Sequence, residues 1–476
     1  MATKVGALAQ ALAAANPWWR DDSWDLVDPD LVEVARSGIE YRPQCLDDLA
    51  SGGLYVLRGP RRVGKTVETK RTVADLIASG VAPRRIIRMA VDGWRADELR
   101  TLVGRTRLPR LLEGESRYWF LDEITGVSEG WAAAIKWLRD NDPEFRAATV
   151  VLTGSNAKGL THGIGLLAGR RGATGVNRSL LPMGFRSFAH VLNPELARAG
   201  VTRQPVAKLR SHDLVEACEE LLVWLDVLVD AWETYLHYGG YPQAAVAAKA
   251  GQEVPEELLD TLFDVVFRDA FDDTGLSELD TSALLSRMAK GLASPVNISS
   301  VAADCDLAME TTKRRLDDLV NNYLLWPCHQ VDAMLQPRRR GQRKMYFTDS
   351  LLARLAHARN TAWTPPDLTA LVEQQIGLAL IRGLEADDPG HLHEHDRIAF
   401  HRTETGSEVD FVGAGLAGAA LEGKYTETGK WVGDARTVNA SPWAGVLATR
   451  NVLDTSARDN AAWAVPAAML AYLVDT

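Results

Sequence analysis

A glycine-rich segment near the start of the chain constrains the fold more than any other feature. It lies between an apolar β-type run at 54–57 and a helical run at 67–77, and it reads Gly59-Pro60-Arg61-Arg62-Val63-Gly64-Lys65-Thr66. Its glycines let the backbone curl so that N–H groups point at phosphate oxygens, and the helix that follows adds the positive end of its dipole. Lys65 is then expected to reach the β- and γ-phosphates and Thr66 to hold Mg²⁺. The alternative is an ordinary strand-turn-helix corner, but the flanking strand and helix favour a nucleotide site.

A second signal is a pair of acidic residues at the end of an apolar run. Residues 118–121 have the pattern of a buried strand, and Asp122 and Glu123 follow them directly. In a parallel sheet both carboxylates emerge at the carboxyl edge, beside the phosphate loop. Asp122 is suited to hold the water shell of Mg²⁺, and Glu123 to orient or deprotonate the attacking water. An acidic pair on the surface is the alternative, but with the loop upstream we expect ATP hydrolysis rather than binding alone.

A third β-type run, at 149–152, also ends in small polar residues. Ser155 and Asn156 follow it and are candidates to sense the γ-phosphate, although a helix cap or a turn explains either residue equally well. Further patterns indicate a strand at 85–92 and an amphipathic helix at 131–141. This alternation of strands and helices predicts a three-layer α/β domain with a parallel sheet.

The size and composition of the chain set further limits. With 476 residues, about three domains are expected, and 46% hydrophobic and 24% charged residues are typical of a soluble globular protein. A formal charge of −10 argues against a protein that coats nucleic acid unselectively. No apolar run is long enough for a membrane helix, and the one at residues 1–15 is too weak for a signal peptide. Four cysteines that lie far apart suggest neither disulfides nor a zinc finger, so we expect a cytoplasmic protein.

Changes of pattern along the chain suggest five regions. Residues 1–50 hold Trp18, Trp19 and Trp24 among acidic residues, which predicts an arm packed on the next domain. The other regions are an AAA-type ATPase core at 51–190, a helical region at 191–290, a winged helix-turn-helix at 291–350 and an α/β domain at 360–476.

Two basic elements fall within the expected winged helix. One is at the start of its second helix, and the other occupies the position of the wing: they comprise Lys313, Arg314 and Arg315, and then Arg338, Arg339, Arg340, Arg343 and Lys344. Recognition helices and wings contact base edges and phosphates, so both elements are candidates for contacts with DNA. The alternative is a winged helix used only for packing or for oligomer contacts.

The last region contains a possible second active centre. Asp410 lies in a hairpin-like segment, Glu422 and Lys424 share one face of the next strand, and Glu373 lies on a helix at 371–383. This constellation resembles the PD-(D/E)XK nuclease fold, in which such carboxylates hold Mg²⁺ to activate water and the lysine stabilises developing charge. A buried ion pair without catalysis is the alternative. Nearby histidines are also candidate metal ligands or hydrated loop residues: His391, His393, His395 and His401.

Taken together and in order, these segments resemble the bacterial and archaeal AAA-type ATPases that carry a C-terminal nuclease-like domain of unassigned function. Besides the phosphate loop, the matching segments are Leu121-Asp122-Glu123-Ile124, Gly130-Trp131, Leu152-Thr153-Gly154-Ser155, Leu167-Ala168-Gly169-Arg170, residues 182–188, Tyr238-Gly239-Gly240-Tyr241-Pro242, Glu408-Val409-Asp410-Phe411 and Leu421-Glu422-Gly423-Lys424. They cover the chain almost from end to end.

The resemblance implies ATP hydrolysis, a winged helix and a nuclease-like module. Arg170, by its match to the Leu-x-Gly-Arg pattern, would then be an arginine finger or sensor that neutralises charge in the transition state. Arg171 is a rival for this role, and a surface salt bridge is the alternative for both. Because AAA-type sites are often completed by an arginine of a neighbour, a homo-oligomer is expected, and a ring is one form of it.

Three functions remain open at this point. The leading hypothesis is an ATP- and Mg²⁺-dependent machine that couples hydrolysis to the binding or remodelling of DNA. The second is a nucleotide-dependent protein switch that touches no nucleic acid, which the acidic charge and the helical middle region favour. The third is a Mg²⁺-dependent nuclease licensed by ATP.

Overall fold

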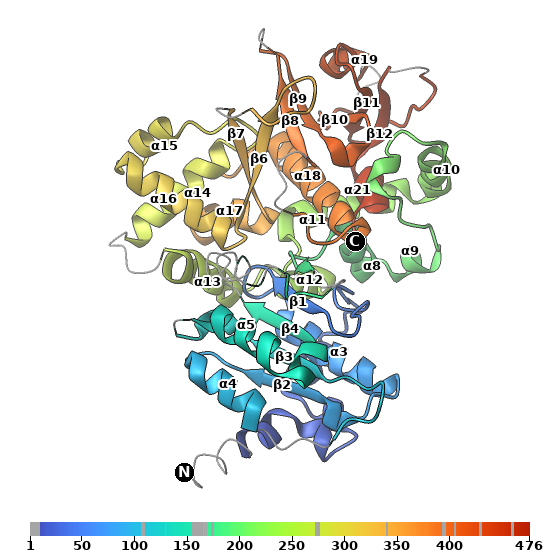
Figure 1. The fold of residues 1–476 in the computed structure, drawn as a ribbon. Helices are drawn as coiled ribbons and strands as arrows, with labels where there is room; N and C mark the ends of the chain where they lie inside the picture. Colours follow the sequence, from blue (N-terminus) through green and yellow to red (C-terminus); the bar gives the residue numbers. More distant parts are fainter. Residues whose placement is uncertain are drawn as a thin grey trace. The chain divides into compact units, whose positions relative to one another are not determined.

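The structure of the protein is a computed structural model. It describes residues 10–105, 110–128, 130–154, 165, 167, 169–172, 176–271, 277–338, 341–392, 397–403, 406–427, 431–457 and 461–476. The chain divides into two compact units, Met1–Leu180 and Leu181–Thr476. Each unit contains a β-sheet with helices packed on it (Figure 1).

The first unit is built on a five-stranded sheet with the strand order β2-β3-β4-β1-β5. Its strands are β1 (Leu54–Arg58), β2 (Ile86–Ala90), β3 (Tyr118–Asp122), β4 (Thr149–Gly154) and β5 (Asn177–Ser179). All pairs are parallel, which confirms the expected sheet. The strands are almost continuously apolar because helices cover both faces of a parallel sheet of this kind.

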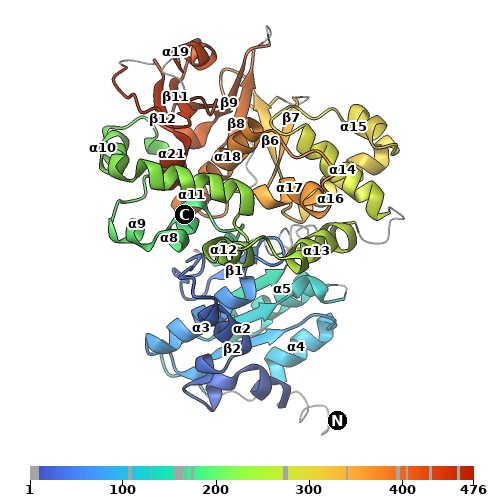
Figure 2. The ribbon, with the colours of Figure 1, turned by 180° about the vertical axis from the view of Figure 1, so that it is seen from behind.

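The direction of the chain crossovers decides which helices cover which face. The helices of this unit are α2 (Pro29–Ser37), α3 (Lys65–Ala78), α4 (Ala96–Arg105), α5 (Trp131–Asn141) and α6 (Pro143–Ala147). From β1 the chain moves to the far edge through α3 and then returns strand by strand through α4 and α5. Right-handed crossovers in opposite directions place α3 on one face and α4 and α5 on the other (Figures 1 and 2).

The N-terminal arm packs on the edge strand β2, as the tryptophans predicted. The indole N–H groups of Trp18 and Trp19 donate to the carbonyl of Ile86, at 3.1 and 3.0 Å. The Asn16 amide donates to the carbonyl of Arg88, at 3.0 Å, and accepts from its N–H, at 2.7 Å. The arm therefore satisfies backbone groups that an open sheet edge would expose.

The second unit contains a seven-stranded mixed sheet with the order β12-β11-β10-β9-β8-β6-β7. Its strands are β6 (Leu325–Val331), β7 (Arg343–Phe347), β8 (Ala399–Arg402), β9 (Glu408–Val412), β10 (Ala419–Gly423), β11 (Ala444–Thr449) and β12 (Trp463–Pro466). The pairs β6/β7, β8/β9 and β9/β10 are antiparallel, and the others are parallel.

The helices of the second unit fall into two stretches of the chain and a C-terminal remainder. The first stretch holds α8 (Phe185–Leu192), α9 (Pro194–Arg198), α10 (His212–Leu221), α11 (Leu225–Tyr238), α12 (Pro242–Lys249) and α13 (Glu256–Asp264). The second holds α14 (Glu278–Lys290), α15 (Ile298–Asp304) and α16 (Met309–Asn321), which precede the hairpin β6/β7. The remainder are α17 (Ser350–Arg359), α18 (Leu368–Asp387), α19 (Trp431–Asp434), α20 (Arg436–Asn439) and α21 (Ala467–Val474).

The sheet of the second unit does not divide where the sequence suggested. We expected a winged helix at 291–350 and a separate domain at 360–476, but β6 pairs with β8 through His329 and Ala399, so the hairpin β6/β7 extends the C-terminal sheet. Similarly, α8 begins inside the expected ATPase core of 51–190, yet it packs on α11 and α21 of the second unit. Strand pairing and helix packing, rather than changes in composition, show where the two units divide.

Helix α18 lies at the centre of the second unit and positions Glu373. It packs on β10 and on α21, α11 and α17 (Figures 1 and 2). Because it is covered on several sides, it is apolar almost all round, and residues 371–384 are all buried. No helix of the described chain has the length and apolar character needed to cross a membrane.

Candidate functional site

The phosphate loop connects β1 to α3 and has the backbone form that its glycines allow. Gly59 has φ +149°, and a Cβ atom there would lie 1.9 Å from the carbonyl oxygen of Leu180. Gly64, at the N-terminus of α3, has φ +97°. Both conformations are costly for a residue with a side chain. The loop residues Pro60, Arg61, Arg62 and Val63 lie between these two points, at the positive end of the helix dipole.

Lys65 points back into the loop. Its Nζ donates to the carbonyls of Gly59, at 2.8 Å, and Pro60, at 2.7 Å, and its side chain is buried. Burial lowers the pKa of Lys65 to about 8, although Glu123 and Asp122 act in the opposite direction. Two carbonyls therefore hold the ammonium inside the loop. A bound phosphate would take their place as the hydrogen-bond acceptor of Lys65.

The donor set at this edge of the sheet fits Mg²⁺. Thr66 is exposed in the first turn of α3, and Asp122 is the last residue of β3, which is parallel to β1 with only β4 between them. Hydroxyl and carboxylate oxygens are the ligands that Mg²⁺ prefers, directly or through water. Thr66 and Asp122 are the residues that would hold the ion.

Two polar residues that sequence reasoning missed hold Asp122 in place. Arg88 of β2 forms an ion pair with Oδ2 of Asp122, and the Thr153 hydroxyl of β4 donates to Oδ1 at 3.2 Å. Burial raises the pKa of Asp122, and Arg88 and Thr153 counteract this. The signal was present in the sequence, because Arg88 is a charged residue inside an apolar strand, where charges need a partner.

Glu123 lies at a strained turn directly after β3. Its φ is +53°, which is uncommon for a residue with a side chain, and its N–H donates to the Thr153 hydroxyl at 3.2 Å. Thr153 thus links the backbone of Glu123 to the carboxylate of Asp122. Strained backbone of this kind clusters at functional sites, which agrees with the role expected of Glu123. The candidate sensors Ser155 and Asn156 lie outside the described residues.

Arg170 does not lie beside the phosphate loop of its own chain. Its Nε is 2.9 Å from Oδ1 of Asp140, near the end of α5, and the adjacent Arg171 accepts a backbone hydrogen bond from Leu54, the first residue of β1. The loop follows the last residue of β1, and a strand of this length separates its ends by roughly 13 Å. Neither arginine therefore lies beside the loop of its own chain, and a role of Arg170 or Arg171 as a finger or sensor stays a prediction.

Two of the residues expected to contact DNA are buried. Arg315 is 1% exposed and pairs with Asp318 at 2.9 Å, and its guanidinium lies over Phe271. Lys344 is 0% exposed and points into the core of the second unit. For both residues the expectation of a DNA contact is wrong. Arg315 lies on the buried face of α16, and Lys344 lies at a position of β7 whose side chain points inward, although both belong to basic runs of the sequence.

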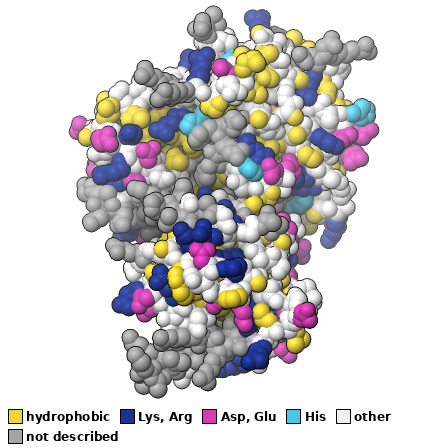
Figure 3. Space-filling view, in the orientation of Figure 1, with side chains coloured by type: hydrophobic (Ala, Val, Ile, Leu, Met, Phe, Trp, Pro, Cys, Tyr) yellow, Lys and Arg dark blue, Asp and Glu magenta, His cyan; other side chains and the backbone are white. Residues whose placement is uncertain are grey.

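The other basic residues are divided between surface and partner contacts. Lys313 and Arg314 are exposed on α16, and Arg338 is exposed between β6 and β7. Arg343 is half-buried, with its guanidinium 3.8 Å from Asp317. Arg339 and Arg340 lie outside the described residues. On the face shown in Figure 3, lysines and arginines are interspersed with aspartates and glutamates.

The residues expected to form a second active centre are close together in the second unit. Glu373 of α18, Asp410 of β9 and Glu422 of β10 are buried, and Lys424 lies just beyond β10, with Nζ 2.8 Å from Oε1 of Glu422. Burial and Asp410 raise the pKa of Glu373 to about 8 and that of Glu422 to about 7.

The arrangement does not fit a metal centre, because Lys344 lies among these carboxylates. Across the described residues, no group of three or more His, Cys, Asp or Glu side chains is arranged to hold a metal ion. His401 is buried: its Nδ1 donates to the carbonyl oxygen of Val331 at 3.1 Å, and its ring packs edge-on against Trp443. His391 is 3.6 Å from Asp388, and His393 and His395 lie outside the described residues.

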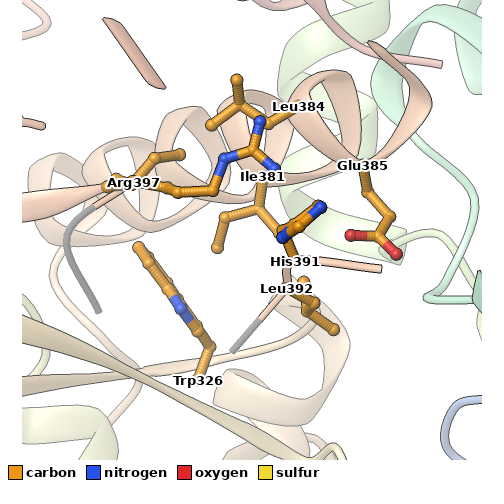
Figure 4. A pocket seen from close by; sticks show the side chains of 8 residues that line it. Trp326, Ile381, Leu384, Glu385, His391, Leu392 and Arg397 are labelled. Atoms are coloured by element: carbon orange, nitrogen blue, oxygen red, sulfur yellow. The ribbon is translucent and has the colours of Figure 1, made fainter. Parts of the chain in front are cut away.

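A small cavity in the second unit is beside His391. Figure 4 shows Trp326, His391 and Arg397 around it, with Ile381 and Leu384 of α18. Its volume is about 20 Å³, which is room for a single water molecule. This cavity is too small for a nucleotide or a nucleobase.

Two family models match parts of the chain. A model described as an AAA domain matches residues 51–189, and one described as a domain of unknown function matches residues 229–362. The first model covers the phosphate loop and the strand that ends in Asp122. The second runs from within α11 to just beyond α17, and its description names no activity. No curated protein matches the chain.

Solved structures that resemble the chain include nucleotide-binding proteins. The Walker-type ATPase of Pyrococcus abyssi is 12% identical, with a TM-score of 0.36 over 66% of this chain and 94% of that one. The ORC2 protein of Aeropyrum pernix is also 12% identical, at 0.33 over 75% and 92%, and a RuvB variant of Thermotoga maritima is 15% identical, at 0.26 over 61% and 84%. These likenesses are too distant to carry an argument. Residues 51–189 therefore match an AAA domain, and the parallel sheet that this region forms is compatible with that match.

Proposed function

We propose that the protein binds Mg²⁺-ATP at the phosphate loop and hydrolyses it. The observation that carries this proposal is the placement of Lys65 and Thr66 at the N-terminus of α3, on the same sheet edge as Asp122 and Glu123. Mg²⁺, when bound, would neutralise charge on the phosphates and orient them.

Each of these residues has a separate task. Lys65 exchanges its two loop carbonyls for phosphate oxygens, and Thr66 and Asp122 provide oxygen ligands to the ion or to its waters. Glu123 orients a water molecule and takes its proton. Thr153 fixes the positions of both acidic residues relative to each other, since it contacts Asp122 and the N–H of Glu123.

The position of Arg170 supports an oligomer in which one chain completes the site of another. Within its own chain Arg170 is at the amino edge of the sheet, paired with Asp140. With 33% of the Arg170 side chain and 43% of the Asp140 side chain accessible to solvent, the pair lies where a neighbouring molecule can approach it. We assign Arg170 as a finger that acts on the nucleotide of an adjacent chain, in a homo-oligomer.

Steady-state phosphate release tests the proposal. The wild-type chain should release phosphate from ATP with Mg²⁺ and not with excess EDTA, and Lys65→Ala and Thr66→Ala should each reduce the rate at least about 100-fold. Glu144→Gln, an exposed residue of α6, is the matched control and should leave the rate unchanged. Turnover that survives Lys65→Ala would disprove the assigned site.

We further propose that nucleotide state is coupled to DNA binding. Support comes from α15 and α16 with the hairpin β6/β7, an order compatible with a winged helix, and from exposed Lys313, Arg314 and Arg338. Changing these three residues to Gln should weaken duplex binding and reduce its salt dependence by about one unit of slope per lost phosphate contact. Arg198→Gln, in exposed α9, is the control. If the protein does not bind duplex DNA at low salt, the proposed coupling to DNA is wrong.

A protein switch without nucleic acid remains the second candidate. Burial of Arg315 and Lys344 leaves fewer basic side chains for DNA than the sequence suggested, and this observation favours the switch. It predicts a turnover rate that DNA does not change, together with a protein partner captured in only one nucleotide state. Stimulation of turnover by duplex DNA would exclude it.

A further inference from the structure

The ammonium of Lys344 lies where carboxylates from two elements meet. Its Nζ is 2.8 Å from Oε1 of Glu373 on α18, and 2.8 and 3.1 Å from the carboxylates of Glu408 and Asp410 on β9. Tyr346 donates to the same Glu373 oxygen at 2.6 Å. Glu373 and Asp410 accept hydrogen bonds from the ammonium, and Glu408 forms an ion pair with it.

This position is the one a divalent ion would need. Mg²⁺ takes oxygen ligands at about 2.0–2.1 Å in an octahedron, so an ion on Glu373 Oε1 and Asp410 Oδ1, which the ammonium contacts at 2.8 and 3.1 Å, would displace or repel the ammonium. The other oxygen of Asp410 accepts from the N–H of Gly423 at 2.9 Å. Lys344 itself is 0% exposed, and its backbone is held in β7 opposite Cys328 of β6.

We infer that Lys344 is the resident cation of this cluster, and that Glu373 and Asp410 bind no divalent metal in the native protein. Lys344 and Lys424 face four carboxylates, those of Glu373, Glu408, Asp410 and Glu422. Burial and Asp410 raise the pKa of Glu373 to about 8 and that of Glu422 to about 7, so protons hold part of the excess negative charge. The inference concerns the second unit alone and does not depend on the ATPase proposal.

The cluster then has a structural task. Lys344 and Tyr346 point from one face of β7 and are joined to α18 and β9, so they fasten the hairpin β6/β7 to the C-terminal part of the unit. With the Lys344 ammonium fixed among these carboxylates, the second unit has no position for the Mg²⁺ that the expected nuclease centre would use to cleave a phosphodiester.

Mn²⁺ binding to the nucleotide-free, full-length protein tests the inference. Electron paramagnetic resonance reports free Mn²⁺, and the wild type should show no bound ion that Asp410→Asn removes. Lys344→Met should gain one Mn²⁺ per chain, and Lys344→Met with Asp410→Asn should lose it again. A wild-type Mn²⁺ site that disappears on Asp410→Asn would overturn the inference, as would a folded Lys344→Met variant that gains no site.

Thermal unfolding supplies a second readout. Removal of one partner from a buried ion cluster should lower the Tm of Lys344→Met by roughly 6–20 °C, and Mn²⁺ should restore part of this loss in the variant but not raise the wild-type Tm. Lys424→Met is the matched control, because Lys424 is 40% exposed and contacts Glu422 only at the edge of the cluster. An equal loss in both variants would contradict the central place given to Lys344.

Discussion

Arg88 of β2 and Asp122 of β3 form an ion pair on one face of the parallel sheet, at the edge that carries the phosphate loop. Ala90 is the direct neighbour of Asp122 across the two strands, and Arg88 reaches it from two residues earlier on the same face. The pair compensates the negative charge of a carboxylate that is buried at this edge of the sheet. The ion pair therefore connects the stability of the first unit to Asp122, the residue expected to bind Mg²⁺ or its waters.

Removal of the Arg88 guanidinium should destabilise the first unit. Arg88→Met leaves Asp122 buried without its cation, and breaking a buried pair in this way costs about 3 kcal/mol. Arg88→Lys should recover part of the loss. Urea unfolding followed by tryptophan fluorescence measures the change, and Arg95→Met, which removes an exposed pair with Asp97, is the control. Equal stability of Arg88→Met and wild type would show that the pair is unimportant.

Substitution of Glu123 should separate binding from turnover. Glu123→Gln keeps the shape of the side chain but cannot take a proton from water, so phosphate release should fall about 10²–10⁴-fold while nucleotide affinity stays within a factor of a few. A fluorescent ATP analogue measures the affinity and a phosphate sensor the rate. Parallel loss of affinity and rate would instead indicate that Glu123 holds the nucleotide or the loop.

The position of Arg170 predicts complementation between two inactive variants. Arg170→Ala should bind ATP normally but lose turnover by roughly 10³-fold, the lower range for an arginine finger. Mixed with Lys65→Ala, which binds no nucleotide but still carries Arg170, it should regain part of the activity, because the intact loop of an Arg170→Ala chain then receives the finger of a neighbouring Lys65→Ala chain. Full activity of Arg170→Ala alone, or no recovery in the mixture at concentrations where the oligomer forms, would exclude a role in trans.

His190 should make the second unit sensitive to acid. Burial, followed by Arg186, lowers the pKa of His190 to about 4, and its Nε2 lies 2.9 Å from the hydroxyl of Tyr472. The unfolded chain takes up a proton near pH 6.5 and the folded one only near pH 4, so stability is complete above pH 6.5 and is lost as the pH falls towards 4. The loss between pH 7 and 5 should be roughly 1 kcal/mol for this partly exposed ring.

The His190→Gln variant checks this sign. It can still bond to Tyr472 but does not titrate, so its Tm should fall less between pH 7 and 5 than that of the wild type. His212→Gln is the control, since the ring of His212 is 81% exposed. If the wild type and His190→Gln showed the same pH dependence, other groups would account for the acid sensitivity.

The phosphate loop and the acidic pair could be placed on one sheet edge from the sequence alone, because both are local features. The loop from Gly59 to Thr66 and the acidic pair after β3 are short motifs whose flanking periodicity fixes the sheet edge on which they lie. Arg88 and Thr153 were missed because their roles depend on strand neighbours, and the strand order β2-β3-β4 cannot be obtained from one sequence.

The basic run before Tyr346 shows where prediction from the sequence alone fails. The many basic residues in this run suggested a DNA-binding wing. Because side chains alternate along β7, however, Lys344 lies on the same buried face of the strand as Tyr346. A cation in alternation with buried aromatic residues was the available signal. Nothing in the sequence placed β6 beside β8, so the proximity of Lys344 to Glu373 and Asp410 required the fold.

Calorimetric titration of the wild-type chain with a non-hydrolysable ATP analogue tests the central claim most directly. We predict one analogue bound per chain in the presence of Mg²⁺, weaker binding in EDTA, and no detectable binding to Lys65→Ala, whose thermal unfolding should otherwise match the wild type. No uptake of the analogue by folded wild-type protein with Mg²⁺ present, or equal uptake by Lys65→Ala, would contradict the account.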